Sequence, residues 1–473
     1  MKQGACVLKL VGGCLVSKRS LVVVAVAAAV AAACLTGAPA AMAKKKITWW
    51  AGGDALFKIL KTEFEKGHKN VEVNIITGDV DKFYTMITAG LMPDVWGPWS
   101  TPGIQADVNR NWALDITPYL KRDAKEVDVA DFFPGVMRQF KVGGKQFSLP
   151  AYMNIDYFYY NTGLWAEAGL VPPPFDSKDK SWSWDMMVEA ALKTTKRDSA
   201  NRLTQQGLAL TVGWFDIPSW FHLWGAQPYS ADAFKTSVPQ KMHFSTPEMV
   251  KAFTKVQELK TRYNVIGSNF VGGKTAASFE NGYMVYSVVA AKKLKWAIRN
   301  LPWAETNSGT LWPNGWRIAK VSKSKDTAWE FVKFLCSREG LRIAGADPKS
   351  HMQFTAPMRK SVFQETLGKN VGNATGMNPA DVYRVAAQAD DVGVVKYQES
   401  ICLHVDMDRF LNPVLQDMWN NKMTPQATAA KLQDIADKRL PELFKRWMRN
   451  IKFTGADKNY DADALPTQKG GLI

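Results

Sequence analysis

Apolar residues near the start of the mature-looking chain recur first with strand spacing and then with helix spacing. Residues 46–50 and 71–76 alternate apolar and polar side chains, which predicts two strands. Residues 56–66 and 83–89 instead place apolar side chains three and four positions apart, which predicts helices, and residues 92–96 predict the tip of a third strand. This alternation of strand and helix favours a mainly parallel α/β sheet.

Ligands of open α/β sheets bind beyond the carboxyl ends of the strands. Polar and aromatic residues follow the predicted strand ends, so we expect one rim to gather Gly52, Gly53, Asp54, Asp94, Trp96 and Trp99. A further strand at residues 208–212 leads into a loop that contains Trp214 and Trp220.

A turn, a strand and a helix follow one another over residues 311–340. Pro313, Asn314 and Gly315 are turn residues, and residues 316–321 suit a strand. After a charged link, residues 327–339 place Ala328 and Phe331 on one helical face. The pattern fits either a hinge between two bodies or one more strand–loop–helix unit of a single domain.

The first 43 residues differ from the rest. They carry four basic residues and no acidic residue, then an apolar run over residues 21–35 and the small-residue pattern Ala41–Met42–Ala43. This predicts a secretory signal peptide. A membrane anchor is the alternative, but the run is shorter than the roughly 20 residues that span a bilayer. Cys34 follows three alanines and is a candidate lipidation site, although the large aliphatic residue usual before such a cysteine is absent.

The charge and the cysteines of the remaining chain limit its chemistry only weakly. Without the four basic residues of the signal segment, 56 Lys and Arg face 44 Asp and Glu, a net charge of +12. Acidic glycans, nucleic acid or anionic lipid could be favoured, but the charge is not concentrated in runs, so a generally basic surface explains it better. Cys336 and Cys402 remain, as a disulfide or as buried thiols.

No catalytic or metal-binding pattern stands out. The nucleophile-elbow and phosphate-loop motifs are absent, and the five histidines lack metal-ligand spacing. Aromatic residues are the positive signal, because tryptophans fall at predicted strand ends and turns, where flat rings can stack on sugars. These are Trp49, Trp50, Trp96, Trp99, Trp214, Trp220, Trp224, Trp312 and Trp316.

Several segments resemble motifs of the bacterial extracellular solute-binding proteins of sugar ABC transporters, the family of maltose- and oligosaccharide-binding proteins. The matching segments are residues 112–120 (WALDITPYL), 143–150 (GGKQFSLP), 164–173 (LWAEAGLVPP), 273–282 (GKTAASFENG), 315–320 (GWRIAK) and 324–340 (SKDTAWEFVKFLCSREG). The chain departs from the family at Met284, where the family has a tryptophan.

The resemblance implies an α/β fold of two lobes, the type II periplasmic-binding-protein fold, with a hinge and a ligand cleft between the lobes. We expect lobe 1 at residues 44–150 and 276–322, with a strand at 283–289. Lobe 2 then comprises residues 151–275 and 323–455, and residues 456–473 form a loose tail.

The resemblance also implies a function. The chain would bind a carbohydrate, an oligosaccharide by preference, and deliver it to ABC permease subunits in the membrane. We expect a monomer in the periplasm or on the extracytoplasmic face, with no enzymatic activity, no catalytic residue, no metal or other cofactor and no nucleic-acid partner. The expected ligand-binding residues are Asp54, Asp94, Trp99, Asn154, Trp214, Gly315 and Trp316.

Three alternatives remain open. A secreted glycoside hydrolase or lyase would use a carboxylate pair such as Asp54 and Asp94. A binder of metal complexes or polyamines is less consistent with the tryptophan content. If the ligand carries carboxylates, as uronic acids do, Arg317 and Arg359 are the basic residues nearest the expected site.

Overall fold

The computed structural model describes residues 44–53, 55–97, 103–214, 217–230, 233, 239–307, 309–346, 355–395 and 404–453. The predicted signal peptide, Asp54, Trp99, Cys402 and the predicted tail lie outside these ranges. Residues from Lys46 onward form one compact unit, to which the description below is confined.

The strands of this unit are short except for two. They are β1 (Lys45–Trp50), β2 (Val71–Ile76), β3 (Val95–Trp96), β4 (Lys141–Val142), β5 (Lys145–Gln146), β6 (Leu149–Asn161), β7 (Lys196–Arg197), β8 (Leu203–Gln205), β9 (Leu208–Leu210), β10 (Ile266–Gly267), β11 (Ala277–Asn281), β12 (Trp296–Arg299), β13 (Gly309–Ile318), β14 (Ala356–Pro357) and β15 (Gly393–Val395).

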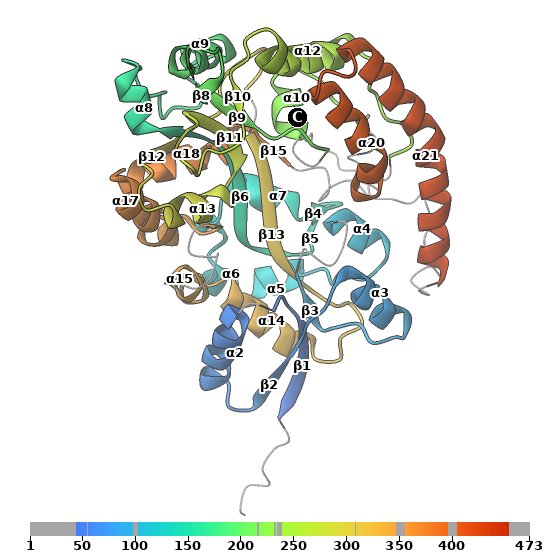
Figure 1. Cartoon of the computed structure of the whole chain (residues 1–473). Helices are drawn as coiled ribbons and strands as arrows, with labels where there is room; N and C mark the ends of the chain where they lie inside the picture. The colour runs from blue at the N-terminus through green and yellow to red at the C-terminus, as the bar shows by residue number, and fades with distance from the viewer. Residues whose placement is uncertain are drawn as a thin grey trace, which may run out of the picture. The chain divides into compact units, whose positions relative to one another are not determined.

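Helices connect these strands and cover the sheet (Figure 1). In the first half of the chain they are α2 (Ala55–Gly67), α3 (Val80–Thr88), α4 (Ile104–Asn109), α5 (Thr117–Arg122), α6 (Ala124–Val127), η2 (Val129–Asp131), α7 (Pro134–Gln139), α8 (Thr162–Glu167), α9 (Trp184–Thr194) and α10 (Ile217–His222). In the second half they are α12 (Pro247–Thr261), α13 (Met284–Ala290), α14 (Lys325–Leu335), α15 (Arg338–Ala346), α16 (Lys360–Phe363), η4 (Gln364–Gly368), α17 (Lys369–Thr375), α18 (Pro379–Val392), α20 (His404–Trp419) and α21 (Pro425–Phe453).

The principal sheet is mixed, whereas a mainly parallel one was expected. Its order along the main path is β10-β9-β11-β6-β13-β3-β1-β2. β1 and β3 are parallel, as are β9 and β11, but β6 pairs antiparallel with β11 and with β13. The two long strands β6 and β13 lie side by side and join the sheet around β1 to the sheet around β9 (Figure 1).

One group of buried side chains, here called the first cluster, surrounds β1 and β3 and includes Trp49, Phe64, Trp316 and Phe331. The ring of Phe331 on α14 lies 4.9 Å from the rings of both Trp49 and Phe64, measured between centroids. Helix α14 therefore packs on β1 and α2. The predicted division counted this helix, within residues 323–455, in lobe 2, and that division stays a prediction.

A second group, here called the second cluster, surrounds β9, α12, α20 and α21. It includes Phe279 of β11, so β11 packs with the elements expected in lobe 2, although the prediction placed residues 276–322 in lobe 1. Gln257 Nε2 of α12 donates hydrogen bonds to the carbonyl oxygens of Met418 and Met423, each at 2.9 Å, and so holds α12 against α20 and the following turn.

Residues 283–289 form most of helix α13, not the predicted strand. The segment is a short apolar run rich in valine, and such a run has no periodicity that separates a strand from a buried helix turn. Two of its side chains, Val285 and Val288, are buried and lie three positions apart, as one face of a helix requires.

Candidate functional site

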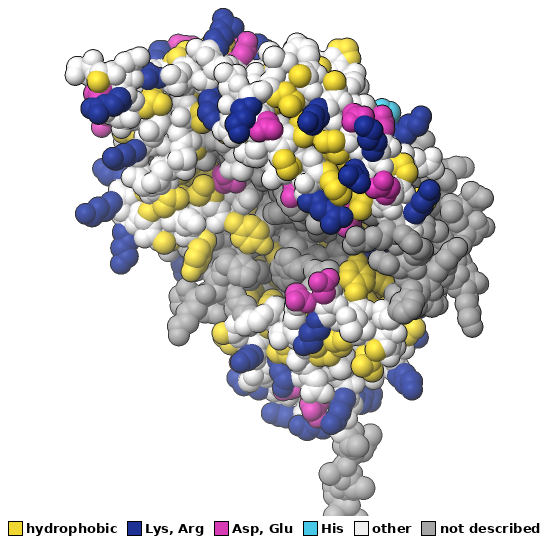
Figure 2. Space-filling model, turned by 45° about the vertical axis from the view of Figure 1, so that its right-hand side comes forward, with side chains coloured by type: hydrophobic (Ala, Val, Ile, Leu, Met, Phe, Trp, Pro, Cys, Tyr) yellow, Lys and Arg dark blue, Asp and Glu magenta, His cyan; other side chains and the backbone are white. Residues whose placement is uncertain are grey.

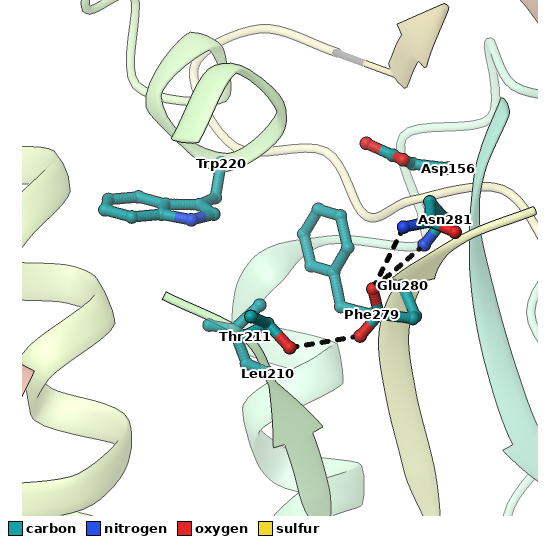
Figure 3. Close-up of a pocket in the computed structure, with 7 residues that line it drawn as sticks. All are labelled: Asp156, Leu210, Thr211, Trp220, Phe279, Glu280 and Asn281. Atoms are coloured by element: carbon teal, nitrogen blue, oxygen red, sulfur yellow. Dashed lines mark hydrogen bonds between the residues drawn. The ribbon is translucent and has the colours of Figure 1, made fainter. Parts of the chain in front are cut away.

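A small depression opens where β9 and β11 end. The described residues that line it are Asp156, Leu210, Thr211, Trp220, Phe279, Glu280 and Asn281 (Figure 3). Its empty volume, open solvent included, is about 250 Å³. Because carboxyl ends of parallel strands are where α/β sheets bind ligands, we take this depression as the candidate site.

The register of the strands brings these residues together. Phe279 of β11 pairs with Leu210 of β9 in the parallel direction, so both strands end at the same edge. On the other side of β11, Asn281 pairs with Asp156 of β6 in the antiparallel direction. Residues more than a hundred positions apart in the sequence are thus fixed by backbone hydrogen bonding and not by a loop.

The Glu280 carboxylate is held in place by its neighbours. It accepts a hydrogen bond from the Thr211 hydroxyl at 3.1 Å, and from the backbone nitrogen and Nδ2 of Asn281 at 3.3 and 3.4 Å (Figure 3). Hydrogen bonds donated to a carboxylate favour its charged form. The site therefore presents an oriented negative charge.

Two buried tyrosines on β6, Tyr157 and Tyr159, lie near these carboxylates. Burial raises the pKa of Tyr157, and the nearby Asp156 charge raises it further. Burial likewise raises the pKa of Tyr159, to which Tyr157, Glu280 and Asp156 add. Both phenols therefore stay neutral and cannot act as bases at ordinary pH.

The aromatic part of the site is Trp220 on α10. Its side chain is 1% exposed and packs edge to face on Phe221 and Phe253, with ring centroids 4.3 and 6.3 Å away. Among the described residues its buried Nε1 has no hydrogen-bond partner. The ring therefore forms the buried floor beside the polar residues of the depression.

Asn154 lies two residues before Asp156 on β6, and it is one of the residues expected to bind ligand. Its side chain is 3% exposed, and neither amide atom has a partner among the described residues. A Cβ added to Gly282, just past the lining residue Asn281, would lie 3.2 Å from Asn154 Oδ1. Buried amides without partners are rare in folded proteins, so the position suits a ligand contact, which stays a prediction.

Asp94 does not follow a strand end as expected, because β3 begins after it. Its Oδ2 accepts hydrogen bonds from the backbone nitrogen and the hydroxyl of Thr48, each at 2.8 Å. Its Oδ1 accepts from the Ser322 hydroxyl at 2.5 Å. The carboxylate thus ties β1 to the segment after β13, and its predicted role in ligand binding is untested.

Gly315 and Trp316 lie together where β13 crosses β6. A Cβ on Gly315 would come within 2.5 Å of Ser148 Oγ and 2.8 Å of the Leu149 carbonyl oxygen, so the close approach that requires glycine is to β6. The Trp316 ring packs edge to face on Trp49, 5.2 Å between centroids. Gly315 therefore allows β13 to approach β6 closely, and Trp316 packs within the first cluster.

Trp214, the third aromatic residue of the prediction, is 0% exposed. Its ring centroid lies 6.3 Å from that of Tyr229 and 5.7 Å from that of Phe244, within the second cluster. These are the surroundings of a core residue, and Trp214 does not line the depression.

The two arginines considered for a carboxylated ligand are both engaged inside the protein. Arg317 Nε lies 2.8 Å from Asp107 Oδ2, and both side chains are completely buried. Arg359 donates from Nε and Nη2 to the carbonyl oxygens of Cys336 and Val127, at 2.6 and 2.8 Å. Both arginines therefore make contacts within the buried interior.

Two further side chains near these elements are buried. Cys336 is a free thiol, and burial raises its pKa, so it is a core residue and not a reactive one. His222, at the end of the helix that carries Trp220, has its pKa lowered by burial to about 4. Its Nδ1 lies 3.0 Å from Gln227 Nε2.

The charged side chains of one face and the possible metal ligands complete the description of the described residues. Lys and Arg side chains are spread among Asp and Glu over the face shown in Figure 2, in line with a generally basic surface. Within the described ranges, His, Cys, Asp and Glu form no group that could hold a metal ion. The helices of the described residues include none with the length and apolarity to cross a membrane.

Most lining residues were missed from the sequence, although signals for them were present. Trp220 was among the aromatic residues at predicted turns, and Thr211 lay in the predicted strand at 208–212. Glu280 and Asn281 fell inside the segment 273–282 that matched the family. The pairing of β11 with β6, which brings Asp156 beside Asn281, could not be predicted from the sequence.

The mixed α/β fold, in which β6 and β13 join two groups of strands, matches that of two-lobe periplasmic binding proteins. The chain belongs to the bacterial extracellular solute-binding protein family, whose model matches residues 60–392.

Solved structures share this fold. An ABC substrate-binding protein of Listeria monocytogenes in complex with cycloalternan superposes with a TM-score of 0.66 at 20% identity, covering 84% of this chain and 99% of that one. A maltose-bound protein of T. maritima gives 0.61 at 17% identity, with 84% and 99% covered. An ABC transporter solute-binding protein of Thermotoga lettingae bound with α-D-tagatose gives 0.60 at 18% identity, with 83% and 100% covered.

Proposed function

We propose that this chain is the extracytoplasmic solute-binding component of an ABC importer and that it binds a carbohydrate in the depression at the ends of β9 and β11. The observation that carries the proposal is the gathering there of polar side chains from three strands and their ends, Asp156, Thr211, Glu280 and Asn281. Carboxylate, hydroxyl and amide groups of this kind bind the hydroxyls of a sugar.

Family membership and the solved structures support a carbohydrate ligand. The Listeria protein holds cycloalternan, the T. maritima protein maltose and the T. lettingae protein tagatose. By the same reasoning the partner is a pair of membrane permease subunits. The protein then acts as a monomer outside the cytoplasm, after removal of residues 1–43, and does not bind nucleic acid.

The packing suggests a division into lobes that differs from the one read from sequence. One lobe would contain the first cluster with β1, β3 and α14, and the other the second cluster with β9, β11, α12, α20 and α21. The hinge would lie in β6 and β13, which belong to both. Ligand binding would close the lobes about this hinge. Small-angle scattering should show compaction on adding a verified ligand, and an unchanged radius of gyration contradicts closure.

We further propose that the protein does not turn its ligand over. The carboxylate pair expected of a glycosidase included Asp94, whose oxygens already accept hydrogen bonds from Thr48 and Ser322. A carboxylate so engaged is a poor proton donor to a glycosidic oxygen.

One experiment separates binding from hydrolysis. Purified protein is incubated with oligosaccharides of several types, its melting temperature is recorded, and the sugars are then analysed by chromatography. We expect a raised melting temperature with at least one sugar and unchanged sugar. Cleaved products identify an enzyme instead, and no shift with any sugar contradicts a carbohydrate ligand.

A further inference from the structure

Two Asn–Gly pairs occur in the sequence, Asn281–Gly282 and Asn314–Gly315. An asparagine before glycine can react with its own backbone, because glycine has no side chain to shield the nitrogen that follows. The first pair lies at the end of β11, where Asn281 lines the depression (Figure 3). The second lies inside β13, so the same chemistry is present in two different surroundings.

Hydrogen bonds hold Asn281 in a reactive arrangement. Its Oδ1 accepts from the Tyr283 backbone nitrogen at 2.9 Å, an Asx turn that brings the side-chain amide over the following peptide. The Tyr159 hydroxyl donates to the Asn281 carbonyl oxygen at 3.1 Å. Burial raises the pKa of Tyr159 well above its ordinary value, so this hydroxyl keeps the proton that it donates.

We propose that Asn281 is a site of spontaneous deamidation. The Gly282 nitrogen attacks Asn281 Cγ, the bond from Cγ to Nδ2 breaks, and the proton lost by the Gly282 nitrogen leaves with Nδ2 as ammonia. The resulting cyclic imide takes up a water molecule, which reaches it from the depression, and opens to aspartate or to isoaspartate. The reaction is neither an oxidation nor a reduction, and water is its co-reactant.

The two hydrogen bonds to Asn281 fall on the oxygens that gain negative charge in this reaction. The Asn281 carbonyl oxygen shares the charge when the Gly282 nitrogen loses its proton, and the Tyr159 hydroxyl stabilises it there. Asn281 Oδ1 becomes negative when Cγ is attacked, and the Tyr283 N–H stabilises that oxygen. Donors that are already in place where charge develops lower the barrier of a reaction.

Packing favours glycine at position 282, so the reactive pair is built into the fold. A Cβ there would lie 3.2 Å from Asn154 Oδ1 and 3.3 Å from the Ile155 carbonyl oxygen. The other pair is shielded, because Asn314 is 6% exposed and both Asn314 and Gly315 pair with β6. The close strand crossing at Gly315 leaves no room for water or for ring closure.

Deamidation changes the depression in two ways. Aspartate replaces a neutral amide by a further carboxylate beside Asp156 and Glu280. Isoaspartate also lengthens the backbone at the residue that pairs with Asp156. Both products should weaken sugar binding, a consequence that rests on the proposed function.

Mass spectrometry tests the modification without any sugar. Native protein is kept in mildly alkaline buffer, and the fraction of each Asn–Gly peptide in which O has replaced NH is followed over time. We expect Asn281 to convert about tenfold faster than Asn314 in native protein, and at a similar rate in protein unfolded by guanidinium chloride. Equal native rates overturn the inference, as does an Asn281 that stays intact while the unfolded control converts.

A pair of variants tests the role of the hydroxyl. Tyr159→Phe keeps the ring and removes the donor to the Asn281 carbonyl, so conversion of Asn281 should slow about tenfold. Tyr157→Phe, on the same strand, is the matched control and should leave the rate unchanged. An unchanged rate in folded Tyr159→Phe overturns the assigned role. A variant that unfolds is recognised by faster conversion of Asn314, and the wild-type comparison then decides.

Calorimetry with a sugar that binds the wild type measures the consequence. The fraction of protein that binds should fall as the converted fraction rises, and Asn281→Asp should bind about tenfold more weakly, since it loses the amide donor. Binding that full conversion leaves unchanged overturns the consequence for the ligand. If no sugar binds even the unmodified protein, the proposed function is contradicted, while the mass-spectrometric result still decides the modification.

Discussion

Tryptophans stand at both ends of the crossing strands, but their surroundings differ. Beside β1 and β13, Trp49 and Trp316 pack edge to face on each other and on Phe57, and a Cβ on Gly97 would meet the Trp316 ring at 2.8 Å. Beside β9 and β11, Trp220 lines a depression shared with Asp156 and Glu280. All three rings are buried, so the difference lies in their neighbours: polar side chains of β6 and β11 lie beside Trp220, whereas aromatic rings surround Trp49 and Trp316.

This comparison implies that changes around β13 act on stability and changes around β11 act on binding. Replacing Arg317 should have the largest effect, because Arg317→Met leaves the Asp107 carboxylate buried without its cation. We expect a loss of about 3–5 kcal/mol in the free energy of unfolding, measured by urea denaturation. The affinity of the folded fraction for sugar should not change.

The double variant Asp107→Leu, Arg317→Met is the control for this pair. Removing both charges avoids an unpaired buried ion, so the double variant should recover much of the lost stability. The stability losses of the single variants Asp107→Leu and Arg317→Met are compared with the loss of the double variant. If the two single losses add up to that of the double variant, the two charges are not coupled as their 2.8 Å contact implies.

The second effect is a pH dependence that arises beside the site. The pKa of His222 is about 4 in the folded protein against 6.5 ordinarily. Between pH 6.5 and pH 4 the histidine is protonated in the unfolded chain but neutral in the folded protein. Its effect on the free energy of unfolding is therefore absent above about pH 6.5, and the free energy of unfolding falls as the pH drops toward 4, by about 3 kcal/mol in all.

Denaturation of the wild type and of His222→Gln across this range measures that contribution. Carboxylates titrate in both proteins, so the difference between the two curves isolates the histidine. The difference should grow as the pH falls. Parallel curves would show that His222 is not buried in its neutral form.

A smaller loss of stability is expected from Gly315→Ala. The added Cβ would meet Ser148 Oγ and the Leu149 carbonyl oxygen at 2.5 and 2.8 Å, so β6 and β13 must separate, at a cost of about 1–3 kcal/mol. Gly53→Ala is the matched control, because nothing lies within 4 Å of its Cβ position. Equal melting temperatures for the two variants would contradict the close strand crossing.

Two tryptophans of the second cluster, Trp214 and Trp220, provide the finest test. Trp220→Phe should weaken sugar binding about tenfold, about 1.4 kcal/mol, since it removes the indole N–H and part of the ring. Trp214→Phe should lower stability and leave affinity unchanged. The reverse result would return Trp214 to the ligand site, as the sequence predicted, and remove Trp220 from it.

The periodicity of side chains predicted β1, α2, β2 and α3 because each has one buried face and one exposed face. It could not predict β6, whose 13 residues are all buried, so no alternation marks its two faces. The apolar face of α14 predicts a buried helix, but it does not indicate which of the two clusters the helix packs on. The site was found only in part, because a depression formed by three strands depends on their register, and register is a long-range property.

The pairing of β6 with β13 also sets the order in which the protein can fold. The partners of Ile155 and Leu149 are Leu311 and Trp316, more than 150 residues later, and β13 in turn joins β6 to β3. The main path of the sheet cannot be completed until Ile318, about two thirds of the way along the chain, is available. Contacts between residues so far apart slow folding, because the entropic cost of closing the long loop comes before the contacts can stabilise the chain. Until β13 is made, β6 therefore lacks its central partner, and the strands around β1 cannot join those around β9 in one sheet.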